Sequence, residues 1–181
     1  ISLKHLERVI MSRCQSLTDT EVQQVLTTSG STLKILELGN TNITGAALDG
    51  VILPKLEKLG LNRCYNLTDT GVRKVLTISG SSLKILNLGH TKISDAALEE
   101  VHLPELENLN LNNCSNLTNS RIRELLRKSG RYLTELHLAR TAVSGSWLVN
   151  WIEHHTSGSM LKLTLKDCSN VSVGGKEKIR T

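Results

Sequence analysis

Residues 56–72, Leu-Glu-Lys-Leu-Gly-Leu-Asn-Arg-Cys-Tyr-Asn-Leu-Thr-Asp-Thr-Gly-Val, decide the fold of this chain, because versions of the stretch recur from end to end. The cysteine of each version marks the period, at Cys14, Cys64, Cys114 and Cys168. Between these copies run shorter ones with threonine in place of cysteine, such as residues 33–43 and 83–93. The residues that open the copies are Leu6, Leu33, Leu56, Leu83, Leu106, Leu133 and Met160. Successive openings lie 23 or 27 residues apart, which predicts an array of about seven coils.

This period is typical of leucine-rich repeats, in which each coil has one strand and one short helix. In the pattern L-x-x-L-x-L the last two leucines are two positions apart, so on a strand they point to one face. Stacked coils can bury that face as a continuous column. The expected column is Leu36, Leu59, Leu86, Leu109, Leu136 and Leu163. The predicted fold class is therefore α/β, a right-handed leucine-rich-repeat solenoid with a curved parallel sheet on its concave face and short helices on its convex face.

The composition predicts one domain with an aliphatic core. Of the 181 residues, 39% are hydrophobic and 22% are charged, and Phe is absent. We expect a repeat domain over residues 1–173 and a flexible tail over residues 174–181. Neither end carries the polar cap that solenoids usually need, so a fragment of a longer protein is expected. No apolar run approaches the 18 or so residues of a membrane helix, so no membrane partner is expected.

The four cysteines are predicted to be buried free thiols. They occupy one equivalent position in coils two apart, which at about 4.8 Å per strand separates neighbours by roughly 10 Å. Bridged Cα atoms lie within about 7 Å, so disulfides are not expected. The sequence has no Cys-x-x-Cys pair and no histidine in the cysteine column, which argues against zinc. Free thiols favour a reducing compartment, so we expect a cytoplasmic location.

The connectors between strands carry helix signals. Thr18 and Glu21 have the spacing of a capping box, and apolar residues then recur at helical intervals. The expected ends of the three long helices are Gly30, Gly80 and Gly130. The sixth connector, residues 144–155, contains Trp147 and Trp151 at helical spacing. Such spacing indicates a broadened core, and the alternative is an exposed docking surface.

Strand residues that point away from the core should carry the function, because solenoids usually recognise partners on the concave face. These positions form a polar, amide-rich and moderately basic strip. The candidate partner-binding residues are Arg13, Glu37, Asn40, Asn62, Arg63, Asn87, His90, Asn110, Asn112, Asn113, His137 and Arg140. A protein partner is therefore expected there, and the alternative is a solvated sheet face without a binding role.

Other functional classes have little support in the sequence. Motifs of nucleophilic hydrolases, zinc proteases and phosphate-binding loops are missing, so no enzyme activity, catalytic residue, metal, cofactor or small-molecule substrate is expected. The net charge is +5, and basic residues cluster within residues 121–131. Glu124 interrupts that cluster and aromatic residues are scarce, which favours a solvated helix face over a nucleic-acid site.

The run Cys64-Tyr-Asn-Leu-Thr-Asp-Thr-Gly-Val72 resembles the cysteine-containing class of leucine-rich repeats, and the likeness extends over nearly the whole chain. The resemblance implies a substrate-recognition array of the kind found in F-box/leucine-rich-repeat adaptors of ubiquitin ligases, although this chain contains no F-box-like segment. Residues 6–55 and 56–105 share long identical stretches, which looks like a recent duplication. The second reading is therefore the sensing or autoinhibitory repeat domain of a NOD-like innate-immune receptor, and the third is a general scaffold.

Overall fold

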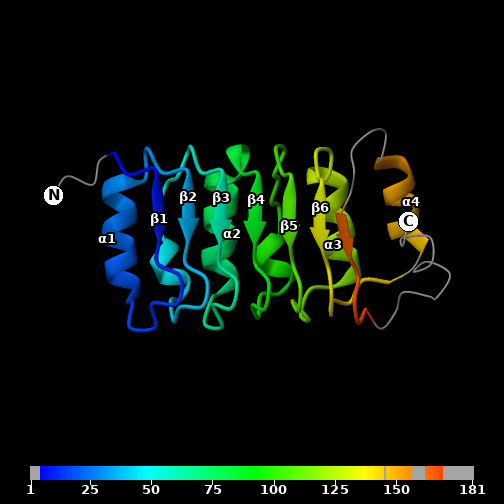
Figure 1. The fold of residues 1–181 in the computed structure, drawn as a ribbon, viewed down its shortest axis with the longest axis horizontal. Coiled ribbons are helices and arrows are strands. Elements are labelled where there is room, and N and C mark those ends of the chain that lie inside the picture. Colours follow the sequence, from blue (N-terminus) through cyan, green and yellow to red (C-terminus); the bar gives the residue numbers. More distant parts are fainter. Residues whose placement is uncertain (1–4, 145, 156–161, 169–181) are drawn as a thin grey trace.

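The computed structural model describes residues 5–144, 146–155 and 162–168, which form one seven-stranded parallel sheet with the strands in chain order. Each strand opens one coil, so strand and coil carry the same number. The strands are β1 (Arg8–Ile10), β2 (Ile35–Glu37), β3 (Lys58–Gly60), β4 (Ile85–Asn87), β5 (Asn108–Asn110), β6 (Glu135–His137) and β7 (Lys162–Thr164). Figure 1 shows them side by side along the length of the molecule. The predicted leucine-rich-repeat solenoid of about seven repeats is thus confirmed.

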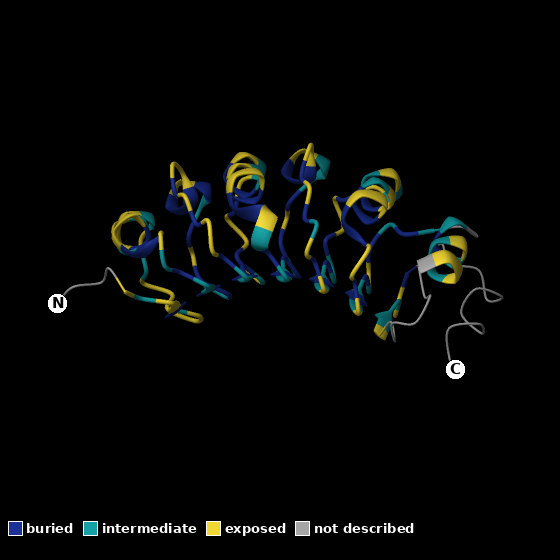
Figure 2. Ribbon diagram, turned by 90° about the horizontal axis from the view of Figure 1, so that it is seen from above, coloured by how far each residue is buried: buried dark blue, intermediate teal, exposed yellow. Residues whose placement is uncertain are grey.

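The helices all lie on the opposite side from the strands. The α-helices are α1 (Asp19–Ser29), α2 (Asp69–Ser79), α3 (Asn119–Ser129) and α4 (Ser146–His155). The 3-10 helices are η1 (Gly45–Leu48), η2 (Gly80–Ser82) and η3 (Asp95–Leu98). An α-helix is about 10 Å wide, whereas neighbouring strands are about 4.8 Å apart, so the helical side is wider and the array bends. Figure 2 shows the resulting arc, with strands on the concave side and helices on the convex side.

The core is the leucine column that the repeat period predicts. The middle residue of each strand pairs with the middle residue of the next, from Val9 to Leu163. The five column members between these two ends have 0% exposure: Leu36, Leu59, Leu86, Leu109 and Leu136. Leu163, in the last coil, is only partly buried. The predicted register is therefore confirmed, and burial is most complete where a coil has neighbours on both sides.

Three of the four cysteines behave as predicted. Cys64, Cys114 and Cys168 are buried free thiols. Each donates a hydrogen bond to a leucine carbonyl of the preceding coil, over 3.1, 3.1 and 3.0 Å. Burial also raises the pKa of the Cys114 thiol, which keeps it protonated. The prediction for Cys14 is wrong, because this thiol is exposed: in the described chain no coil precedes β1 to cover it.

The helix ends are confirmed, but one reason for them differs from the expectation. Thr18 and Glu21 form the expected capping box, and the bonds that Thr18 donates lower the pKa of the Glu21 carboxyl. The glycine after α1 has φ −56°, so it is not the left-handed residue of a common helix cap. A Cβ at Gly30 would lie 2.7 Å from the Leu26 carbonyl oxygen and 2.8 Å from that of Ile52. Glycine is required there by close packing against the next coil.

Helix α4 broadens the core at the sixth coil, as expected from its tryptophans. Leu148 is buried, and Trp147 and Trp151 are partly buried against the core. The Trp147 indole donates a 2.7 Å hydrogen bond to Asn119, at the start of α3. The predicted tail, residues 174–181, lies outside the described residues. Within the described ranges, no helix is both long and apolar enough to cross a bilayer.

Candidate functional site

The candidate site begins at the turns in which the strands end. Seven residues at equivalent positions of the seven coils have a left-handed backbone, with φ between 55° and 69°. They are Arg13, Asn40, Arg63, His90, Asn113, Arg140 and Asp167. In the first six coils the amide of this residue donates to a carbonyl of the following coil, over 2.7 to 3.0 Å. The amides of this row are therefore bonded internally and are not available as donors to a partner.

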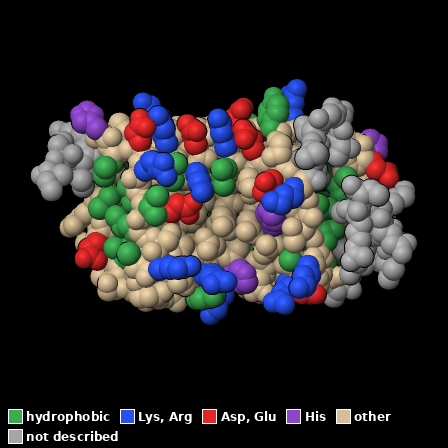
Figure 3. All heavy atoms as spheres, viewed as in Figure 1, with side chains coloured by type: hydrophobic (Ala, Val, Ile, Leu, Met, Phe, Trp, Pro, Cys, Tyr) green, Lys and Arg blue, Asp and Glu red, His purple; other side chains and the backbone are tan. Residues whose placement is uncertain are grey.

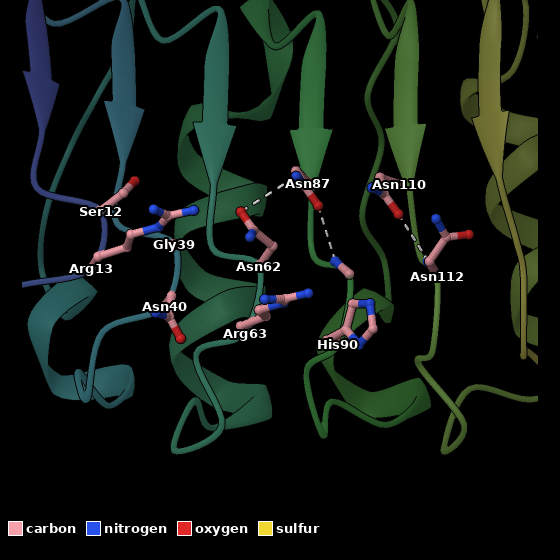
Figure 4. A pocket seen from close by; sticks show the side chains of 11 residues that line it. Ser12, Arg13, Gly39, Asn40, Asn62, Arg63, Asn87, His90, Asn110 and Asn112 are labelled. Carbon is pink, nitrogen blue, oxygen red and sulfur yellow. Dashed lines mark hydrogen bonds between the residues drawn. The ribbon is translucent and has the colours of Figure 1, made fainter. Parts of the chain in front are cut away.

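A shallow groove of about 450 Å³ runs along the concave face beside these turns. Its lining residues come from the first five coils: Ser12, Arg13, Gly39, Asn40, Asn62, Arg63, Asn87, Gly89, His90, Asn110 and Asn112. Figure 4 shows the four labelled turn residues of coils 1–4 in a row just past the strand ends, with the asparagines beside them. The groove thus brings together eight of the predicted partner-binding residues.

The asparagine side chains are held in a defined orientation. The Oδ1 of Asn87 accepts from the Gly89 amide over 3.1 Å, and the Oδ1 of Asn110 accepts from the Asn112 amide over 3.0 Å. The Oδ1 of Asn112 accepts from the Ala139 amide over 2.8 Å. Since a backbone N–H can donate only to the oxygen of an amide side chain, each of these contacts assigns the Oδ1 and leaves the Nδ2 on the other side.

Glycines make room for these side chains. A Cβ at Gly39 would lie 2.5 Å from the Oδ1 of Asn62, and a Cβ at Gly89 would lie 3.0 Å from the Oδ1 of Asn110. The Asn62 Oδ1 accepts a 3.4 Å hydrogen bond from Asn87, which links two neighbouring coils (Figure 4). Small residues in one coil and amides in the next therefore interlock across the groove.

The groove is cationic at the strand exits. Its lining includes two arginines and one histidine, and among these lining residues there is no carboxylate. Within the described part of the chain, neither Arg13 nor Arg63 has a hydrogen-bond or ion-pair partner for its guanidinium. These two groups are therefore available to an anionic partner without breaking an existing contact.

The rest of the concave face carries ion pairs between coils, mostly at the strand starts. Lysine and glutamate side chains from successive coils lie within 2.8 to 4.0 Å of each other: Lys34 with Glu7, Lys58 with Glu37, Lys84 with Glu57, and Lys162 with Glu135. Figure 3 views the concave face and shows acidic and basic side chains alternating along the strand-start edge, above a central area that carries few charges. The unpaired cations of the groove are thus on the far side from a row that contains these four ion pairs and, at the start of β1, the described residue Arg8 without an ion pair.

Four of the predicted partner-binding residues do not line the groove. Glu37 extends over Gly60 and forms the ion pair with Lys58 noted above. His137 contacts Thr164 over 3.0 Å, and Arg140 pairs with Asp167 over 3.1 Å. The fourth residue, Asn113, lies in the turn row of coil 5. Three of the four are thus engaged within the array, and sequence reasoning could not separate them from the open positions because their repeat positions are equivalent.

The lining glycines and Ser12 were missed as site residues, although a signal for them exists. Gly39 and Gly89 occupy the same repeat position as Asn62 and Asn112, so glycine alternates with asparagine down one column. Alternation of glycine and asparagine in an outward-facing column indicates that an amide side chain of one coil lies over the glycine of the coil before it.

The remaining chemistry of the described residues is limited. No group of three or more His, Cys, Asp or Glu side chains is close enough there to hold a metal ion. On helix α3 the basic cluster is partly neutralised, because Glu124 bonds Arg121 over 2.8 Å and Lys128 over 2.7 Å. These cations hold the pKa of the Glu124 carboxyl below its usual range. This helix is a solvated convex face with internal ion pairs.

Comparison with known proteins identifies the fold. No family model matches the sequence, and no curated protein is found to be similar to it in sequence. Among solved structures, this chain is similar to a chain of the yeast complex of Rad7 and Elc1. The TM-score is 0.57 and the identity is 19%, over 81% of this chain and 44% of the yeast chain. The likeness spans less than half of the yeast chain, and at this identity it shows a shared repeat fold alone.

Proposed function

We propose that the chain is a non-catalytic protein-interaction module that binds a protein partner in the concave groove. The observation that carries the proposal is the row of open polar side chains at the strand exits of coils 1–5, next to a row of ion pairs that lie mostly at the strand starts. The open side chains, Arg13 and Arg63 among them, can bind a partner without breaking a contact within the array. The similar yeast chain also occurs in a complex with a second protein.

We propose further that the module is the substrate-recognition array of an F-box/leucine-rich-repeat ubiquitin-ligase adaptor. Support comes from the repeat motif of residues 64–72, in which Cys64 and Leu67 are buried anchors and Thr68 caps helix α2. The free state of all four cysteines supports a reducing compartment such as the cytoplasm. The repeat domain would extend over residues 1–173.

The proposed function can be tested with a photo-crosslinking amino acid placed at two exposed sites in the full-length protein in its own cells. Ser12 lines the groove, whereas Arg123 lies on the convex helix α3. We expect a discrete protein adduct from position 12 and none from position 123. Equal labelling from both positions, or no protein adduct from position 12, would contradict the concave-groove proposal.

The fate of the crosslinked protein separates the two candidate functions. For a ligase adaptor, we expect the protein captured at position 12 to carry ubiquitin and to persist longer when the gene for this chain is disrupted. For an immune receptor, the expected adduct is a microbial molecule or the receptor's own nucleotide-binding domain. The observation that supports this second function is the long identical stretches that residues 6–55 and 56–105 share.

A further inference from the structure

We propose that the groove binds an extended, aspartate- and glutamate-rich segment of the protein partner, which runs along the array across coils 1–5. The inference rests on the proposed interaction function and specifies the chemistry of the partner. It follows from three properties of the groove: an excess of hydrogen-bond donors, the charge of its lining, and the spacing of its cations.

The groove presents donors because most of its amide side-chain oxygens already accept a bond within the array. The Oδ1 atoms of Asn62, Asn87, Asn110 and Asn112 each accept a bond from within the array. Among the described residues, the Nδ2 groups of Asn62, Asn110 and Asn112 donate to nothing. The turn amides, which could have donated, are held by the following coil. A ligand in this groove therefore meets unpaired side-chain N–H groups, which an acceptor-rich ligand would satisfy.

The charge of the lining selects an anionic acceptor. Arg13 and Arg63 carry unpaired guanidinium groups, and His90 is next to Arg63 in the row (Figure 4). Guanidinium matches a carboxylate through two parallel hydrogen bonds. The carboxylate of Glu37, at the end of β2, is held by Lys58 over 2.8 Å. A carboxylate from a partner would thus fill an open position.

The spacing of the cations favours several single charges over one concentrated charge. Arg13 and Arg63 are two coils apart, which is about 10 Å at the usual distance between strands. In the extended polyproline II conformation, three residues make one turn and cover about 9 Å, so residues three positions apart lie on one side of the segment. Acidic residues three positions apart would therefore reach both guanidinium groups. Separate carboxylates at this spacing can meet one guanidinium group each, whereas one phosphate group places its whole charge at a single point of the groove.

The lining also disfavours single-stranded nucleic acid. Such ligands usually stack their bases on aromatic side chains. The lining of the described groove has no Phe, Tyr or Trp, and its one ring is the imidazole of His90. A protein segment needs no stacking surface, since its carboxylates and carbonyl oxygens match the exposed donors directly.

The probe for this inference is a fluorescein-labelled peptide of about twelve residues, built of Gly and Ser with Asp at every third position. Three comparison probes keep its length: Asn in place of Asp, phosphoserine in place of Asp, and single-stranded oligothymidine. Binding to the whole 181-residue chain is measured by fluorescence anisotropy at low and at physiological salt. We expect the Asp peptide to bind at least about tenfold more tightly than the Asn peptide, with the difference reduced by salt.

The groove variant is Arg13→Asn combined with Arg63→Asn. Both positions have a left-handed backbone, and asparagine tolerates it and already occupies the equivalent positions 40 and 113. The variant should therefore keep the fold, which circular dichroism and the unfolding midpoint verify. The matched control, Arg123→Gln with Arg127→Gln, removes the same charge from exposed positions of helix α3. We expect the groove variant to weaken the Asp peptide about tenfold or more, and the control to change it less than twofold.

The outcomes divide cleanly. Equal affinity for the Asp and Asn peptides, tighter binding of the phosphoserine peptide or of oligothymidine, or equal effects of the two double variants would each overturn the inference. If these results occur while position 12 still crosslinks to a protein, the partner binds in the groove by other chemistry and only this inference fails. If position 12 also captures no protein, the proposed function fails with it.

Discussion

At the scale of single residues, the leucine column is fully buried in its five central members. Leu86 has 0% exposure and lies between Leu59 and Leu109 in the register. Replacing Leu86 with alanine leaves a cavity that the neighbouring coils cannot close, and we expect a loss of about 2–5 kcal/mol in the free energy of unfolding. Urea unfolding followed by circular dichroism measures the loss. The control is Leu163→Ala at the partly buried end of the column, which should lose less; equal losses would contradict the register.

The cysteines differ from one another at the same scale. Cys14 is exposed, while the other three thiols are buried and donate to backbone carbonyls. A thiolate-selective disulfide reagent should therefore modify one thiol rapidly in the native protein and all four in denaturant. Spectroscopic counting of the released product measures both phases. Cys14→Ser should remove the rapid phase, and rapid reaction of two or more thiols in the native protein would be the contrary result.

At the scale of elements, the junction between coils 2 and 3 is unusually close. At most junctions between coils 1 and 6, an Asp or Asn side chain accepts a hydrogen bond from the backbone amide of the helix-capping residue in the next coil. Asp19 accepts from the Thr44 amide in this way, and Asp69 accepts from the Ser94 amide. At the second junction, Gly45 occupies that position and packs directly on Gly71 of helix α2. Two glycines thus replace the carboxylate contact with backbone packing.

This contact predicts that Gly71→Ala destabilises the protein, although alanine is favoured over glycine in helix interiors by about 1 kcal/mol. The added Cβ would lie 2.3 Å from the Cα of Gly45 and 2.7 Å from its carbonyl oxygen, so the coils must separate. Thermal unfolding measures the change, with Thr70→Ala on the exposed side of the same helix as a control. A gain in the unfolding midpoint for Gly71→Ala would show that the junction can relax.

Most of the elements could be predicted from the sequence, because the same leucine, capping and glycine positions recur in successive coils. The leucine register, the capping box at Thr18 and the helix ends all follow from spacing. The exposure of Cys14 did not follow, because repeat equivalence ignores which coil has a neighbour. The division of the outward strip into paired and open residues also did not follow. Whether an arginine meets a carboxylate depends on which residue the adjoining coil places beside it, as Arg140 meets Asp167 while Arg63 has no acidic neighbour in the groove.

At the scale of the whole molecule, the array is held together by neighbouring coils alone. Each strand pairs only with the one before and the one after it, so β4 has two partners and β1 has one in this chain. The same order places the groove over coils 1–5 and leaves it dependent on the stability of the coils at that end. In such an array, stability is close to a sum of coil and interface contributions.

Native-state hydrogen exchange should therefore be graded along the array. The amides of Met11 and Leu61 are matched, because each donates to a carbonyl of the following strand over 2.8 Å. Opening coil 1 breaks one interface, whereas opening coil 3 breaks two, so we expect the Met11 amide to exchange about tenfold faster or more. Since the two hydrogen bonds have equal length, a difference in exchange rate would reflect the number of coil interfaces that each opening breaks. Equal rates would mean that the array opens only as a single unit, and the groove would then be as stable at its first coil as at its centre.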